Sequence, residues 1–203
     1  MKYGKIFSKA KLGYKTKFFN NLIFSTIISI LLNGYNFESY IELKINKTGI
    51  IQFYNKYENN FFFFSPSKIN INGENLSDVN NVYDFNNTNN IVQLIWENTD
   101  CKNISYMFYK CSSIIEIDLS HFNFSNIRYM DHMFSKCIEL RKIKFSNINI
   151  TSVETMNSMF KNCKSLTSLV SFNFDTQAVK NKSYLFSNCS SLTSLNLFHP
   201  VIE

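Results

Sequence analysis

The side chains of this sequence with the most distinctive chemistry are five cysteines and three histidines. Four of the cysteines follow one another at intervals of 26 residues: Cys111, Cys137, Cys163 and Cys189. A structural zinc site needs C-x-x-C pairs or histidines close to two cysteines, and the sequence has neither. We therefore expect no metal site. The four cysteines are predicted to form a structural ladder, either as small apolar fillers of a tight corner or as disulfides in an oxidising compartment.

The histidines give no catalytic pattern. His121 and His199 occupy the same position relative to the spaced cysteines, and His132 stands alone. The chain has no Gly-rich phosphate loop, no G-x-S-x-G or H-E-x-x-H motif and no paired-carboxylate signature. We predict no enzymatic activity, no catalytic residues and no cofactor.

A repeat of 26 residues accounts for the cysteine spacing. Short blocks ending in cysteine recur, such as Met133-Phe134-Ser135-Lys136-Cys137, and apolar residues follow each cysteine at offsets of three and six, as in Leu140 and Ile143. Further apolar residues lie at offsets of 16, 19, 22, 23 and 26: Ile127, Met130, Met133, Phe134 and Cys137 in the first full unit. The fifth cysteine, Cys101, falls at offset 16 of a degenerate earlier unit and is expected in the core.

These spacings predict the fold of each unit. The L-x-x-L-x-L pattern after each cysteine indicates a strand, and the later steps of three and four indicate a short helix. A single unit buries too little to fold alone, so units must stack. The predicted fold class is an α/β repeat solenoid that resembles leucine-rich repeats, with a parallel sheet on one face and short helices on the other.

The motif M-F-x-x-C-x-S-L-x-x-L resembles the 26-residue BspA-like leucine-rich repeats of bacterial and protist surface proteins. Residues 159–169 match it almost letter for letter, and the resemblance extends over 104–198. It implies a cell-surface or secreted protein that acts in adhesion or recognition. Ser171, Lys182 and Pro200 depart from the pattern, so the last units are weaker and the final one is incomplete.

Three regions are expected along the chain. Residues 97–203 hold the repeats, and residues 36–96 form an N-terminal β cap over the first repeat. In this cap Ile41, Leu43 and Ile45 alternate with polar residues, as in a half-buried strand. A run of four phenylalanines, 61–64, is expected as a buried cap strand, with a sticky binding patch as the alternative.

Residues 1–35 are predicted to be a signal peptide or an uncleaved signal anchor. This segment contains six lysines, all before residue 18, and no acidic residue. The apolar run that follows at 22–32 is shorter than the ~20 residues of a membrane span. Localisation is therefore expected to be secreted or at the cell surface, with membrane contact only through this segment. The alternative is a cytoplasmic protein whose first residues are ordinary structure.

The formal net charge of +6 comes from the leader. The 203 residues contain 21 basic and 15 acidic side chains, and removing the six leader lysines leaves 15 of each. Because the remaining chain is neutral, no nucleic-acid partner is expected.

The candidate partner-binding face is the outward side of the predicted strands. Parallel neighbours would place Glu116 beside Lys142 and Asp118 beside Lys144; the alternative to binding is that these are solvated cross-strand pairs. The complete face comprises Glu116, Asp118, Lys142, Lys144, Ser168, Val170, Ser194 and Asn196. Its expected partner is a protein or glycan, with host and matrix components as candidates. The alternatives to this recognition function are an intracellular protein–protein interaction scaffold and a truncated member of a surface-protein family.

Overall fold

The computed structural model describes residues 39–55, 57–58, 61–62, 65–97, 100–145, 148–170 and 178–193. All of them belong to one unit of the chain, Glu38–Glu203. The predicted leader, Ser171, Ser194, Asn196, His199 and Pro200 lie outside the described residues, as do the side chains of Tyr57, Glu58, Phe61, Phe62 and Val170. The interpretation of residues 61–64 as a buried strand or a sticky patch therefore falls on side chains outside the description.

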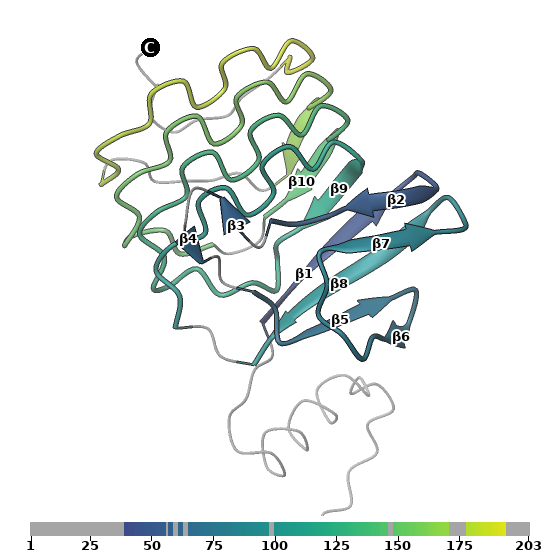
Figure 1. Ribbon diagram of the computed structural model, residues 1–203. Helices are drawn as coiled ribbons and strands as arrows, with labels where there is room; N and C mark the ends of the chain where they lie inside the picture. Colours follow the sequence, from purple (N-terminus) through teal and green to yellow (C-terminus); the bar gives the residue numbers. More distant parts are fainter. Residues whose placement is uncertain are drawn as a thin grey trace, which may run out of the picture. The chain divides into compact units, whose positions relative to one another are not determined.

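The described residues form eleven strands and no helix (Figure 1). One mixed sheet has the order β11-β10-β9-β1-β8-β5-β6, and two further sheets are the pairs β2-β7 and β3-β4. Strands β9, β10 and β11 are parallel to one another, whereas β1 is antiparallel to both β8 and β9. The bounds are β1 Ser39–Ile45, β2 Gly49–Gln52, β3 Tyr57–Glu58, β4 Phe61–Phe62, β5 Lys68–Ile71, β6 Glu74–Asn75, β7 Val82–Phe85, β8 Asn90–Trp96, β9 Ile114–Asp118, β10 Lys142–Lys144 and β11 Ser168–Val170.

The predicted α/β class was wrong, because the segments expected to be helices are successions of turns. We call each 26-residue unit of the stack a coil. In residues 104–111, alternate N–H groups bond within their own coil to the carbonyl three residues earlier, as Met107 does to Ile104 at 3.3 Å. The N–H groups between them bond to the next coil instead, as Phe108 does to the Met133 carbonyl at 2.9 Å. In an α-helix, each N–H beyond the first turn would instead bond within the helix to the carbonyl four residues earlier. Here half of them hold neighbouring coils together, which Figure 1 shows as wavy traces running side by side.

Left-handed residues explain why the helix does not form. Two residues in each coil, four positions apart, have φ between 54° and 66°: Tyr106 and Lys110, His132 and Lys136, Ser158 and Asn162, and Tyr184 and Asn188. A left-handed residue breaks a right-handed helix. The expected burial was nevertheless confirmed, since Ile127, Met130 and Met133 are fully buried. Apolar steps of three and four therefore marked the buried side of consecutive turns.

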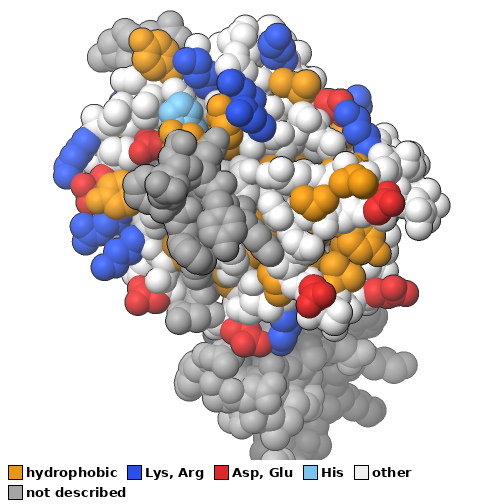
Figure 2. Space-filling model, viewed as in Figure 1, with side chains coloured by type: hydrophobic (Ala, Val, Ile, Leu, Met, Phe, Trp, Pro, Cys, Tyr) orange, Lys and Arg blue, Asp and Glu red, His pale blue; other side chains and the backbone are white. Residues whose placement is uncertain are grey.

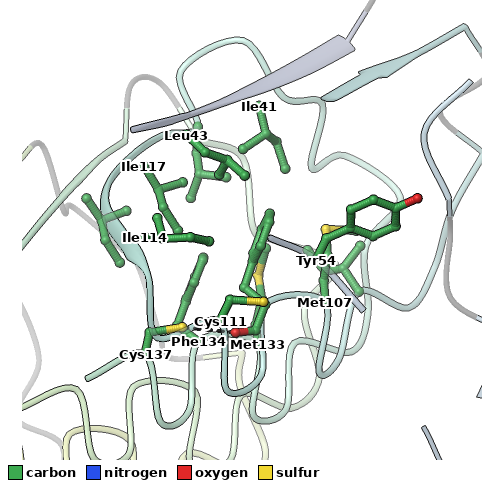
Figure 3. Close-up of a cluster of buried hydrophobic side chains, with 14 of the residues drawn as sticks. Ile41, Leu43, Tyr54, Met107, Cys111, Ile114, Ile117, Met133, Phe134 and Cys137 are labelled. Atoms are coloured by element: carbon green, nitrogen blue, oxygen red, sulfur yellow. Dashed lines mark hydrogen bonds between the residues drawn. The ribbon is translucent and has the colours of Figure 1, made fainter. Parts of the chain in front are cut away.

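Identical residues form columns through the core. The rings of Phe108, Phe134, Phe160 and Phe186 are stacked with centroids 5.2–5.6 Å apart and planes within 5° of parallel. Beside them, the three later cysteine thiols of the ladder each donate to the phenylalanine carbonyl of the preceding coil, whereas the Cys111 thiol lies 3.9 Å from the Tyr109 carbonyl of its own coil. The Cys137, Cys163 and Cys189 sulfurs lie 2.9–3.0 Å from those oxygens. Figure 3 shows Cys111 and Cys137 in the same buried cluster as Phe134.

All five cysteines are free thiols, including Cys101, which is buried as expected. Burial raises the pKa of the thiols at Cys111, Cys137 and Cys163, and raises that of the less buried Cys189 to about 11. These thiols are therefore protonated near neutral pH, as a thiol that donates a hydrogen bond must be.

Strand β1 joins the N-terminal part of the chain to the repeats. It pairs with β9 along the edge that a preceding coil would otherwise occupy. The predicted alternation in β1 was confirmed, because Ile41, Leu43 and Ile45 are fully buried. Ile41 and Leu43 point into the cluster that also contains Ile114 and Ile117 of the repeat (Figure 3). The two regions thus share one hydrophobic core.

Asn55 caps the turns of the first coil. In later coils the Met133 and Ser135 carbonyls accept N–H groups of the coil before them. In the first coil, which has no such predecessor, the equivalent Met107 carbonyl accepts the Asn55 backbone N–H at 2.8 Å, and the Tyr109 carbonyl accepts the Asn55 side-chain amide at 2.8 Å. The same amide N–H group also donates to the Tyr106 carbonyl at 2.8 Å. The side-chain oxygen of Asn55 accepts a hydrogen bond from the Gln52 side-chain amide. One asparagine thus replaces part of a missing coil.

We predict that Asn55→Asp destabilises the fold. The carboxylate has the same shape but cannot donate to the Tyr106 and Tyr109 carbonyls, so two hydrogen bonds of ~1 kcal/mol each are lost. The negative carboxylate would also be repelled by the partial negative charge of those two carbonyl oxygens. Urea unfolding should show a loss of about 2 kcal/mol or more. The deficit should shrink on acidification toward the ordinary aspartate pKa of about 3.9, because the protonated carboxyl donates again. Asn126→Asp, at an exposed position, is the control, and equal stability of the two variants would contradict the cap.

A thiol titration tests the cysteine ladder. Protein purified without reductant should show five reactive thiols per chain after denaturation. In the native state Cys137 and Cys163 should react with a thiol reagent only as fast as the protein unfolds, and the less buried Cys189 should react sooner. Fewer than five thiols in the denatured protein would show disulfides and refute this arrangement.

Candidate functional site

The candidate site is the outward face of the seven-stranded sheet. Strand residues alternate between the two faces, so burial of Ile41, Leu43 and Ile45 directs Tyr40, Glu42 and Lys44 outward. The same alternation in β8 buries Val92, Leu94 and Trp96 and directs Ile91, Gln93 and Ile95 outward. The face is therefore built from the repeats and from the N-terminal strands together.

Strand register arranges the outward side chains in three rows across the sheet. The middle row is polar and runs Asn70, Gln93, Glu42, Asp118, Lys144. The upper row runs Ile91, Lys44, Glu116, Lys142, Ser168. The lower row runs Lys68, Ile95, Tyr40; the Lys68 ammonium lies 2.8 Å from the Glu97 carboxylate, and the Tyr40 ring is stacked on the His121 ring with centroids 4.5 Å apart.

Two ion pairs cross between neighbouring strands on this face. The Lys44 ammonium lies 2.7 Å from the Glu116 carboxylate, and this hydrogen bond raises the pKa of Lys44. The Lys144 ammonium lies 2.9 Å from Asp118. Burial alone would raise the pKa of Asp118, but hydrogen bonds from the Ser120 side chain and backbone and from Lys144 outweigh it and lower the pKa overall. Asp118 is therefore ionised at neutral pH.

The formal charges of the face cancel. Four carboxylates are matched by four ammonium groups: Glu42, Glu97, Glu116 and Asp118 against Lys44, Lys68, Lys142 and Lys144. Figure 2 shows a similar mixture on the side of the molecule in view, where lysine, arginine and acidic side chains are interspersed. Neither surface has the broad single sign of charge that attracts a polyelectrolyte.

Two depressions lie on the face, and both include Glu42. One, of about 160 Å³, is lined by the two ion pairs together with Glu42, Ile117 and Lys142. The other, of about 440 Å³, is lined by Glu42, Gln93, Ile91 and the neighbouring residues Asn70, Asn72, Gly73 and Asn89. Glu42 is thus the side chain where the two depressions meet.

The structure brings together five of the residues proposed from sequence: Glu116, Asp118, Lys142, Lys144 and Ser168. The predicted neighbours were confirmed, since Lys142 is paired in register with Glu116 and Lys144 with Asp118. Val170 pairs with Lys144 through its backbone, while Ser194 and Asn196 lie outside the described residues.

Sequence reasoning missed Tyr40, Glu42, Lys44, Asn70 and Gln93. The alternation in residues 39–45 did predict that Glu42 and Lys44 face away from the core. It could not show that they adjoin Glu116 and Asp118, because pairing of β1 with β9 joins segments about 70 residues apart.

The histidines and cysteines that the structure describes are not gathered into one centre. His121 is stacked on Tyr40, His132 is stacked on Tyr106, and the cysteines lie in the core. Over the described ranges, no three His, Cys, Asp or Glu side chains are grouped so that they could hold a metal ion. Nor does any helix with the length and apolar character of a membrane span occur in that part of the chain.

Comparison with known proteins supplies a family. Neither the curated proteins nor the solved structures include a significant match to this sequence. One family model matches residues 74–197, which comprise more than half of the chain and include β9, β10 and β11. The chain therefore belongs to the DUF285 family, described as "Mycoplasma protein of unknown function".

Proposed function

We propose that this chain is a non-enzymatic recognition protein, secreted or held at the cell surface, that binds a protein or glycan partner through the outward face of its sheet. The observation that carries the proposal is the face itself: polar side chains from five adjacent strands form fixed rows over two depressions. Surfaces of this kind on repeat proteins commonly bind partners.

Rigidity of the supporting core favours recognition. The outward side chains alternate with fully buried residues such as Leu43, Val92, Ile117 and Ile143, which hold the strands in register. A face whose side chains are already positioned loses less conformational entropy on binding. The two ion pairs further restrict Lys44, Glu116, Asp118 and Lys144.

Two sequence features support the surface location. The lysine-rich start and the apolar run at 22–32 are typical of a secretory leader. The M-F-x-x-C units resemble those of BspA-like surface proteins, for which adhesion and recognition are the expected activities.

A second candidate is an intracellular scaffold that uses the same face. The observation in its favour is the set of five free cysteines, since secreted proteins more often pair their cysteines than cytosolic ones do. Cell fractionation with N-terminal sequencing separates the two candidates. Surface exposure and removal of the leader support the first candidate, whereas an intact Met1 inside the cell supports the second.

Charge reversal at the face tests binding directly. The full chain should be screened against immobilised matrix proteins, mucins and glycans. We expect Lys142→Glu with Lys144→Glu to lose binding, because both lysines would become acidic beside Glu116 and Asp118. The matched control is Lys110→Glu with Lys136→Glu, the same charge change on the exposed turns.

Thermal unfolding of both double variants must show that they remain folded at the assay temperature. Unchanged binding by the folded Lys142 and Lys144 variant, or equal loss in the control, would refute use of this face.

A further inference from the structure

We propose that the outward face binds an uncharged carbohydrate, with Glu42 at the centre of the site. This inference rests on the proposed recognition function and names the chemical class of its ligand. The argument comes from the charge balance of the face, its unused hydrogen-bonding groups, its apolar borders and the shape of its depressions.

Charge balance favours a neutral ligand. The four carboxylates and four ammonium groups of the face sum to zero, and six of the eight are already engaged in ion pairs at 2.7–2.9 Å. In the smaller depression a charged ligand would have to compete with these pairs, and the larger depression is lined by a single charged side chain, Glu42, which repels anions. Hydroxyl groups can instead add hydrogen bonds to carboxylates and amides without breaking the pairs.

Glu42 and Gln93 offer complementary groups at adjacent positions. The Gln93 side-chain amide donates to Oε2 of Glu42 at 3.1 Å. Among the hydrogen bonds of the described residues, the second carboxylate oxygen of Glu42, Oε1, accepts none, and neither does the side-chain oxygen of Gln93. Two acceptors held side by side suit the neighbouring hydroxyl donors of a sugar ring.

Apolar side chains border this polar pair on both sides. Ile91 and Ile95 flank Gln93 along β8, and the Ile91 side chain is 41% exposed. Tyr40 precedes Glu42 on the same face of β1, and its ring is stacked on the exposed His121. Burial, with the negative charges of Glu42 and Asp118, raises the pKa of Tyr40, so its hydroxyl stays a donor at neutral pH. A sugar ring has the matching character, with polar edges and apolar C–H faces.

The larger depression is shallow and open, and the smaller one adjoins it. Their volumes of about 440 Å³ and 160 Å³ meet at Glu42. An open surface of this kind suits an extended ligand that lies along the sheet with one side in solvent, as a short oligosaccharide does. Three asparagines, Asn70, Asn72 and Asn89, also line the larger depression, and Asn70 is paired in register with Gln93.

The test uses the full chain on an array that contains neutral, anionic and cationic glycans together with matrix proteins. We expect binding to neutral oligosaccharides, with an affinity that changes little as salt rises, because no net charge is exchanged. For the neutral glycan that binds best, titration calorimetry should show about tenfold or greater weakening for Glu42→Gln and for Gln93→Ala.

Glu139→Gln is the matched control, because Glu139 is ion-paired with Lys47 at 2.6 Å and lines neither depression. It should leave the affinity unchanged, and thermal unfolding should confirm that every variant is folded. Equal affinity of Glu42→Gln, Gln93→Ala and the wild type for a neutral glycan would overturn the site.

Other outcomes separate this inference from the proposed function. Binding only to charged glycans or to proteins, lost on charge reversal at Lys142 and Lys144, would overturn the carbohydrate inference and keep the recognition function. Absence of binding to every probe would count against both.

Discussion

The hydrogen bonds between coils are the constraint on which the rest of the structure depends. In each run of turns, alternate N–H groups close the turns of their own coil, and the groups between them reach carbonyls of the next coil, as Phe108 reaches Met133 and Phe134 reaches Met159. A coil by itself would leave half of these donors without a protein acceptor. Because buried peptide groups must be hydrogen-bonded, the coils are stable only as a stack.

This ladder fixes the side chains as well as the backbone. Residues 26 positions apart are held one coil apart, so phenylalanine stacks on phenylalanine and the Cys137, Cys163 and Cys189 thiols donate to carbonyls of the preceding coil. The same geometry on the strand side places Lys142 next to Glu116 and Lys144 next to Asp118. Core columns and surface rows are thus two consequences of one repeat distance.

The start of the stack is completed by residues that do not belong to a repeat. Asn55 supplies hydrogen-bond donors to the first run of turns, and β1 occupies the free edge of β9. Covering an open sheet edge in this way also prevents it from pairing with another chain. An antiparallel strand at this position adds Tyr40, Glu42 and Lys44 to the outward face of the sheet formed by the repeat strands. The candidate site therefore lies where the cap and the repeats meet.

By itself, the sequence determined which residues are buried and which repeat positions are neighbours. The 26-residue period, the buried columns, the alternation of Ile41, Leu43 and Ile45 and the pairing of Lys142 with Glu116 all follow from the spacing of residue types. Tertiary structure decided two things that spacing cannot express. Apolar steps of three and four record burial but not hydrogen-bond partners, so only the neighbouring coil and the left-handed residues selected turns over helices. The pairing of β1 with β9 joins distant segments through backbone N–H and C=O groups, which are alike in almost every residue. No pattern of side chains therefore predicts this pairing, and only the folded chain shows that Glu42 lies beside Asp118.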